Sequence, residues 1–150
     1  MPSLSLHAFG RAALLFSVIA ALAAACSSQP RYPTAPRQGA DIVIDAASLD
    51  VGVPRFFTYR YQHRDVNFFV LRLPAGVTSY LDSCLTCYPR HLGYEYKEGY
   101  VSCRACDTHY PVYKLERGMG GCHPIRVSGR MENGNYLISQ EELQKHAGKF

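Results

Sequence analysis

Two Cys-x-x-Cys pairs constrain this chain more than any other feature of its sequence. Fifteen residues separate the pair formed by Cys84 and Cys87 from the pair formed by Cys103 and Cys106. Two such hooks at this separation can bring four thiolates to one metal centre. Thiolates bind zinc, iron or an iron–sulfur cluster, whereas calcium and magnesium require oxygen ligands. The spacing therefore predicts a thiolate metal site and leaves the metal open between iron and zinc.

Other uses of paired cysteines fit less well. Neither hook is followed by histidine, since Tyr88 and Asp107 occupy those places, which disfavours covalent c-type haem attachment. The βαβ pattern that surrounds a thioredoxin-like dithiol is absent from the sequence. A framework of disulfides alone would leave one thiol unpaired, because five cysteines remain when Cys26 is set aside. A metal-free disulfide protein is thus the alternative that the cysteine count favours least.

Three further residues are candidates for the same site. Cys122 lies in a glycine-rich stretch, 118–124, whose backbone could approach a metal centre closely; an ordinary turn with a buried free cysteine is the other interpretation. His109 follows Cys106 at a spacing typical of metal ligands, and His91 follows the first hook. We treat His109 as a possible secondary ligand, although a lone histidine is more often a surface or hydrogen-bonding residue.

The N-terminal region has the features of an export signal. The segment 12–25 is apolar and uncharged, too short to cross a bilayer comfortably, and it ends in alanines directly before Cys26. This is typical of a bacterial lipoprotein, in which residues 1–25 are removed and Cys26 is lipidated; an ordinary secretory signal cut near Ala25 is the alternative. Both predict a protein of the bacterial envelope facing the periplasm, and Ser27 favours the outer over the inner membrane.

The segment 26–40 is rich in proline and polar residues and is expected to act as a tether reaching roughly 40 Å. A metal-binding β domain is expected over 41–150. Its alternating and apolar runs predict a mostly β fold, a small antiparallel sheet with two cysteine-hook metal loops and one short C-terminal helix. The expected elements are strands 41–45, 55–62, 66–73 (central in the sheet), 125–132 and 135–139, hairpin turns at 97–99 and 133–134, and a helix over 140–146.

The net charge is modest, +4, and basic and acidic residues alternate along the expected strands. Such a distribution indicates a solvated surface and argues against nucleic acid as a partner. The sequence also shows no recognisable constellation of catalytic acid, base and nucleophile. An electron-transfer protein, which needs little beyond a bound cofactor near its surface, is therefore expected rather than an enzyme.

Taken together, these motifs resemble the FtrD-like iron–sulfur proteins associated with bacterial ferrous-iron uptake. The resemblance runs in order through most of the expected domain, in Phe68–Leu71, Asp82–Cys87, Gly93–Tyr94, Val101–Cys106, Gly120–Ile125, Ile138–Leu143 and Phe150. The Gly-Gly-Cys-x-Pro element around Cys122 is its most distinguishing part. Asp107 departs from the glycine that the family commonly has after the second hook.

The resemblance implies an iron–sulfur centre with Cys84, Cys87, Cys103 and Cys106 as prime ligands and Cys122 as a fifth candidate. It further implies single-electron exchange with redox partner proteins, among them a periplasmic iron- or copper-binding protein and an iron permease. The alternative is a zinc-stabilised structural or binding lipoprotein without redox activity.

A fainter resemblance is to Rieske and rubredoxin-like architectures, in which two ligand loops project from a small antiparallel β domain. His91 and His109 echo the histidines of a Rieske centre. The spacing of the first hook differs, however, because three residues separate Cys87 from His91 and a Rieske pair is separated by one. We take this likeness as an expectation of architecture and not of two-histidine ligation.

Overall fold

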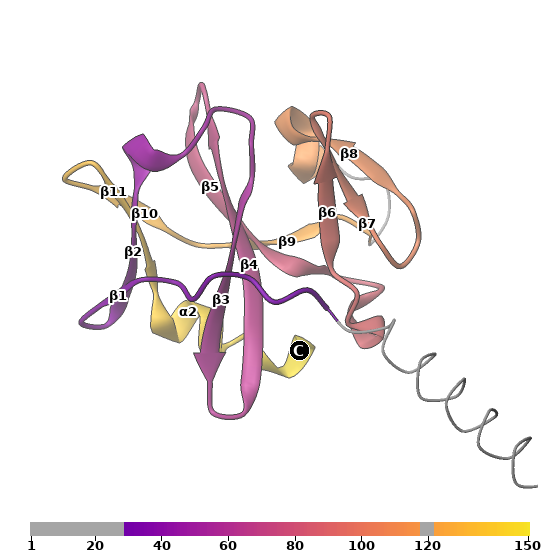
Figure 1. The fold of residues 1–150 in the computed structure, drawn as a ribbon, viewed down its shortest axis with the longest axis horizontal. Coiled ribbons are helices and arrows are strands. Elements are labelled where there is room, and N and C mark those ends of the chain that lie inside the picture. The colour runs from indigo at the N-terminus through magenta and orange to yellow at the C-terminus, as the bar shows by residue number, and fades with distance from the viewer. Residues whose placement is uncertain (1–28, 118–121) are drawn as a thin grey trace, which may run out of the picture.

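The computed structural model describes residues 29–117 and 122–150. Within them, eleven strands form three antiparallel sheets (Figure 1). Their order is β1-β2-β11-β10 in the first sheet, β3-β4-β5-β9 in the second and β6-β7-β8 in the third. The strands are Arg37–Gln38 (β1), Asp41–Asp45 (β2), Arg55–Tyr61 (β3), Arg64–Leu73 (β4), Gly76–Cys84 (β5), Tyr94–Lys97 (β6), Tyr100–Cys103 (β7), His109–Pro111 (β8), Pro124–Val127 (β9), Arg130–Glu132 (β10) and Asn135–Ser139 (β11).

The second sheet lies in the middle of the molecule because its strand β4 is apolar on both faces. Residues 66–71 of this strand are all buried, which confirms its predicted central position. One face, including Phe68 and Val70, packs with Ile42 and Ile138 of the first sheet. The opposite face is formed in part by Phe69 and Leu71, and it packs against the third sheet in a second, separate core. The mostly β, antiparallel fold that the sequence predicts is therefore present, divided into three small sheets.

Both predicted hairpin turns are confirmed. Asn133 and Gly134 adopt φ values of 48° and 80° between β10 and β11, the left-handed conformation that a two-residue turn of type I′ requires. Glu98 and Gly99 adopt φ values of 50° and 85° between β6 and β7. Both tight turns fix the pairing of the strands that they join.

The expectation of one strand over 125–132 is wrong. The chain forms β9, which pairs with β5 of the second sheet, and then β10, which pairs with β11 of the first. Gly129 lies at the crossing, and a Cβ atom there would collide with the ring of Tyr136. Because glycine lets the backbone pass directly beside that ring, the chain changes sheets here instead of continuing as a single strand.

A short helix, Gln140–Gln144 (α2), follows β11 as predicted, ending two residues earlier than expected. The Ser139 hydroxyl accepts a hydrogen bond from the Glu142 N–H at 3.2 Å, the bond expected of an N-cap serine. The Glu142 carboxylate accepts a hydrogen bond from the Ser128 N–H, at the point where the chain crosses between the sheets. The helix therefore closes one end of the first core, into which Leu143 is fully buried.

The segment that precedes β1 lies against the second sheet from Gln29 onward (Figure 1). Backbone hydrogen bonds join Pro33 and Ala35 to Thr58 of β3, and the Tyr32 ring stacks on Phe56 with centroids 4.9 Å apart. Contacts with the folded domain thus begin twelve residues before position 41. The tether role expected of 26–40 stays a prediction.

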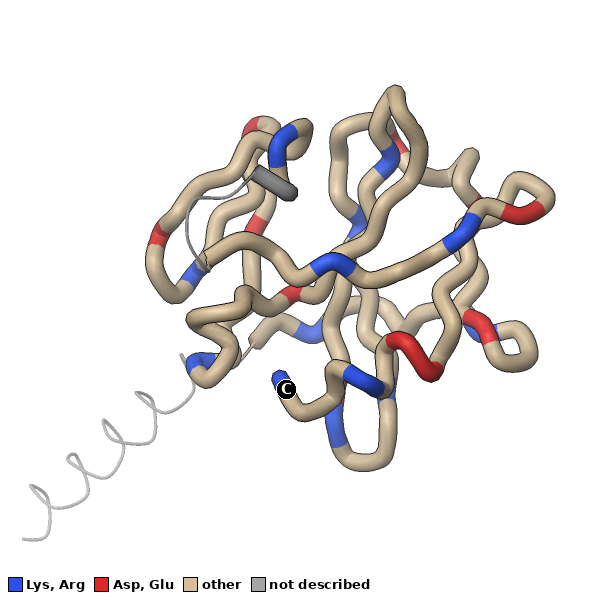
Figure 2. Tube along the Cα trace, turned by 180° about the vertical axis from the view of Figure 1, so that it is seen from behind, with Lys and Arg blue, Asp and Glu red and all other residues tan. Residues whose placement is uncertain are grey.

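The charged side chains are spread over the described chain with both signs interspersed (Figure 2). Several of them form ion pairs between strands of one sheet, such as Arg60 with Asp65 on adjacent strands and Arg130 with Asp41 across β11, each at 2.8 Å. Isolated pairs of this kind contribute little to stability. The pattern matches the solvated surface expected from the sequence.

Candidate metal centre

The two cysteine hooks come from different sheets and face each other across the second core. Cys84 ends β5, and Cys87 lies in the turn that follows it. Cys103 ends β7, and Cys106 lies in the next turn, ahead of β8. The strands of the third sheet pack against the β4 and β5 face through Phe69, Tyr80, Tyr94, Val101 and Tyr110, among others. Apolar packing between sheets therefore positions the hooks.

Strand pairing also explains why a fifth cysteine reaches the site. Cys84 lies opposite Pro124 in the register of β5 with β9, so Cys122 enters two residues before a strand already paired beside the first hook. The hydroxyl of the fully buried Tyr94 donates a hydrogen bond to the Cys122 carbonyl at 3.0 Å. The start of β9 is thus held at the centre by a strand of the third sheet.

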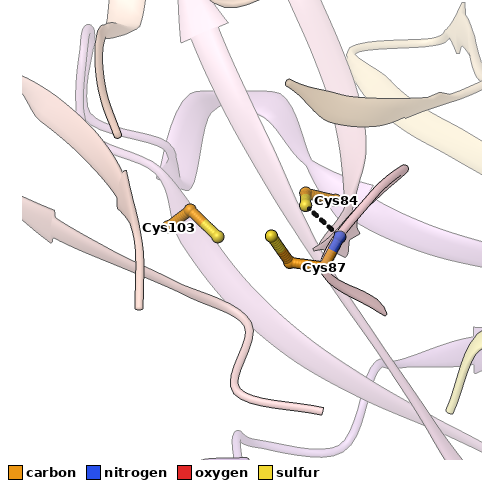
Figure 3. A group of neighbouring side chains, drawn as sticks. All are labelled: Cys84, Cys87 and Cys103. Atoms are coloured by element: carbon orange, nitrogen blue, oxygen red, sulfur yellow. Dashed lines mark hydrogen bonds between the residues drawn. The ribbon is translucent and has the colours of Figure 1, made fainter. Parts of the chain in front are cut away.

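The thiols lie in two overlapping groups. The Sγ atoms of Cys84, Cys87 and Cys103 lie within 4.8 Å of one another, and Figure 3 shows the thiols of Cys87 and Cys103 turned toward each other. The Sγ atoms of Cys87, Cys106 and Cys122 also lie within 4.8 Å of one another. Cys87 belongs to both groups. The structure therefore brings together all five cysteines of the described domain.

Burial is graded across the two groups. Cys84 and Cys103 are buried, Cys87 and Cys122 are half-buried, and Cys106 is exposed. A centre held here would have an inner side enclosed by the second core and an outer side near solvent.

Each hook is built as a turn that directs backbone N–H groups at its first sulfur. The N–H of Cys87 donates to Cys84 Sγ at 2.9 Å (Figure 3). In the second hook the N–H groups of Ala105 and Cys106 bond to the sulfur of Cys103. These bonds favour the negatively charged thiolate, which is the form that binds metal.

The protonation of the thiols reflects burial opposed by these bonds. Burial raises the pKa of Cys103 to about 11, although the two backbone N–H groups lower it. Burial and the neighbouring thiols of Cys84 and Cys106 also raise the pKa of Cys87. At Cys106, burial raises the pKa, but hydrogen bonds from Thr108 and from the thiols of Cys103 and Cys122 together outweigh it and lower the pKa to about 7. Metal binding must therefore displace protons from the thiols of Cys87 and Cys103, as thiolate sites generally require.

Two arginines connect the hooks. Arg90, in the short 3₁₀ helix Tyr88–Arg90 after the first hook, donates to the Ala105 carbonyl of the second at 2.7 Å. Arg104 of the second hook donates to the carbonyls of Leu92 and Tyr94 between the two. Both side chains therefore bridge the loops by bonds to backbone oxygens, a cross-connection that the sequence spacing gave no sign of.

A buried carboxylate lies beneath the first hook. Asp82 is fully buried and accepts hydrogen bonds from the Tyr94 N–H at 2.5 Å, the Tyr32 hydroxyl at 3.0 Å and the Gln29 amide at 3.1 Å. Burial raises its pKa to about 6, and the three donors oppose that rise. Sequence reasoning missed the roles of Asp82 and Tyr94. The available signal was an acidic residue inside an otherwise buried run, since unpaired carboxylates are almost never fully buried.

Neither His109 nor His91 belongs to the two thiol groups. The His109 ring has its Nδ1 2.6 Å from the Ser102 hydroxyl and its Nε2 3.5 Å from Asp107, and no histidine belongs to either thiol group among the described residues. His91 adopts φ 50° and ends the 3₁₀ helix after the first hook. Cys26, the expected lipidation site, lies outside the described residues.

The thiol site and the fold together define a class of protein: a β domain with a cluster of cysteines between two sheets that is suited to bind a metal centre. A comparison with protein families matches residues 49–150 to the family described as membrane iron-sulfur containing protein FtrD-like. The chain belongs to this family, which confirms the resemblance drawn from the sequence motifs. No curated protein and no solved structure matches the chain. Among the described residues, no helix has the length and apolar character needed to cross a bilayer.

The residues present fit an iron–sulfur group. Five thiols converge within two overlapping groups, and backbone N–H groups point at two of the sulfurs. All-cysteine ligation and hydrogen bonds to sulfur are the common features of such sites in proteins. The donor set also suits zinc, so the chemistry of the thiols alone leaves the type of centre open.

Proposed function

We propose that this protein is an envelope-anchored iron–sulfur protein that transfers electrons as an accessory to bacterial iron uptake. The observation that carries the proposal is the convergence of five cysteines between two sheets in a member of a membrane iron–sulfur family. When bound, the centre would accept and release single electrons. The protein's own contribution is to hold the sulfurs, to stabilise their negative charge through N–H bonds and to limit access of water from the side of Cys84 and Cys103.

The graded burial supports exchange with a partner protein. Cys106 and Leu85 are exposed, and each belongs to one hook. A redox partner that docks over the hook tips would therefore come close to the centre, while the second core shields its inner side. We propose a periplasmic iron- or copper-binding protein and an iron permease as the physiological partners, and electron transfer rather than catalysis as the activity.

The decisive experiment is an ultraviolet–visible spectrum with iron, zinc and acid-labile sulfide analysis on the full chain purified without oxygen. We expect visible absorption that bleaches on reduction, with iron and sulfide in near-equal amounts. Cys103→Ser should lose the colour and His109→Ala should keep it, because the histidine ring bonds to Ser102 instead of joining the thiols. A colourless protein with tightly bound zinc would reject electron transfer and favour a structural lipoprotein.

Anchoring is tested separately from the cofactor. We propose that Cys26 carries the lipid and that the protein faces the periplasm from the outer membrane. Cells fed a radiolabelled fatty acid should label the wild-type protein and not Cys26→Ala, and fractionation should recover the wild-type protein with outer membranes. Equal labelling of both chains, or release of the wild-type protein with soluble periplasmic proteins, would contradict lipid anchoring.

A further inference from the structure

The five cysteines are too many for one tetrahedral site and are not arranged as one. A single zinc or iron ion bound by cysteines takes four thiolates. Here the hook cysteines do not form one group of four; the thiols form two groups of three, and Cys87 is common to both. Cys106 and Cys122, one from a hook and one from outside the hooks, complete the second group.

We propose that these cysteines provide two metal positions that share Cys87, an inner one with Cys84 and Cys103 and an outer one with Cys106 and Cys122. Cys122 is then a metal ligand and not a spare thiol. Each position has three thiolates from the chain and leaves further coordination to donors such as inorganic sulfide. The inference deepens the proposed function, on which it rests for the identity of the metal; the number of positions is independent of that identity.

The surroundings of the two positions differ. Both thiols that belong only to the inner group are buried, whereas the outer group pairs exposed Cys106 with half-buried Cys122. A metal at the inner position is enclosed by the second core, and one at the outer position is open to solvent. We therefore expect the outer metal to bind more weakly and to leave first when a chelator is added.

The Tyr94 hydroxyl contributes to both positions, because it bonds to the sulfur of Cys84 in the inner group as well as to the segment that carries Cys122. The carbonyl of Cys122 accepts from the Tyr94 hydroxyl at 3.0 Å, and β9 begins two residues later at Pro124, opposite Cys84. Removing the hydroxyl keeps all five cysteines in the chain but releases the segment that carries Cys122 from β6. Tyr94 is therefore a positioning residue for the outer position.

Cobalt(II) alone is a suitable probe. Like zinc(II) and iron(II), it is a divalent first-row metal that binds thiolates, and its thiolate complexes are coloured. The full chain, purified in detergent and stripped of metal under argon, is titrated with cobalt. We expect thiolate-to-cobalt absorption to saturate at two equivalents for the wild type, at one for Cys122→Ser and at two for the control His109→Ala. Tyr94→Phe should still bind two equivalents of cobalt, the second about tenfold more weakly than in the wild type, a loss of about 1.4 kcal/mol.

Saturation of the wild type at one equivalent would overturn the proposal, as would a Cys122→Ser variant that still binds two. The wild-type stoichiometry decides the matter even if the serine variant does not fold. The test is distinct from that of electron transfer. If the protein holds a bleachable iron–sulfur centre but binds one cobalt ion, the proposed function stands and the proposal of two metal positions is rejected. If it is a colourless zinc protein that binds two cobalt ions, the two positions stand and the proposed electron transfer is rejected.

Discussion

Gly93 shows at the scale of one residue how closely the loop between the hooks is fitted to the first hook. It adopts φ +67°, and a Cβ atom there would lie 2.5 Å from the Asp82 carboxylate. Gly99 provides a matched control, because it also has a positive φ, +85°, and an added Cβ would meet nothing within 4 Å. We expect Gly99→Ala to cost about 1 kcal/mol of unfolding free energy through backbone strain alone.

Gly93→Ala should cost about 3 kcal/mol or more, since overpacking against a fully buried carboxylate adds to the same strain. Urea unfolding of both variants in the metal-free state measures the two costs. Equal losses would show that the contact with Asp82 does not limit this position.

Asp82 itself predicts a dependence of stability on pH. Its pKa is raised by burial from 3.8 to about 6 in the folded protein. Between these values the folded protein binds a proton that the unfolded chain does not, so this residue stabilises the fold as pH falls through about 6 and destabilises it at neutral pH. Relative to Asp82→Asn, the metal-free wild type should gain about 2 kcal/mol between about pH 7.5 and 4.5.

The measurement is urea unfolding of both proteins across that range under reducing conditions. The difference between them isolates Asp82 from groups that act in the opposite direction, such as His146, whose pKa is lowered by burial. A constant difference between wild type and variant would contradict the raised pKa of Asp82.

Among the elements, the segment before β1 is the one whose packing has the most direct connection to the cysteines. Tyr32 stacks on Phe56 and donates to Asp82, two residues from Cys84. Tyr32→Ala should lower the unfolding free energy by about 2–3 kcal/mol through the lost ring contact and the unmet carboxylate oxygen. Arg31→Ala, an exposed neighbour, should change it by less than about 0.5 kcal/mol. Similar effects of the two substitutions in thermal unfolding would show that the segment is not part of the folded unit.

The elements also show what can be deduced from this sequence. The apolar run at 66–71, the Asn133–Gly134 turn and the Ser139 cap are local signals, and each predicts the element that forms. The division of 125–132 between two sheets depends on the close approach of Gly129, directly before β10, to the ring of Tyr136 on the paired strand β11, a contact that periodicity does not encode. The spacing of the hooks predicts the site. That Cys87 belongs to both thiol groups follows only from how two sheets pack.

For the whole molecule, the thiol groups lie between the second and third sheets, which also meet through the second core and through the hydrogen bonds of Tyr94 to Asp82 and to Cys122. Cys103 and Cys106 belong to the third sheet and its turn, whereas Cys84 and Cys122 border the second. Removing the metal should therefore loosen the third sheet more than the rest, because a bound metal stabilises the state that brings its ligands together. Hydrogen exchange should show roughly tenfold or greater loss of amide protection in β6–β8 and little change in β3 and β4. Uniform loss over all three sheets would indicate that the metal supports the entire domain.

If Cys26 carries a lipid, the docking of the segment from Gln29 onward limits how far the folded domain can lie from the membrane. For a chain lipidated at Cys26, only three peptide steps lie between the lipid and Gln29, which is bonded to Asp82 beneath the first hook. These steps span roughly 10 Å, compared with the roughly 40 Å available if all of 26–40 were free. The folded domain of such a protein would stay close to the lipid surface. Its partners would have to share that membrane or diffuse to it, and a permease in the opposite membrane would need a soluble carrier between them.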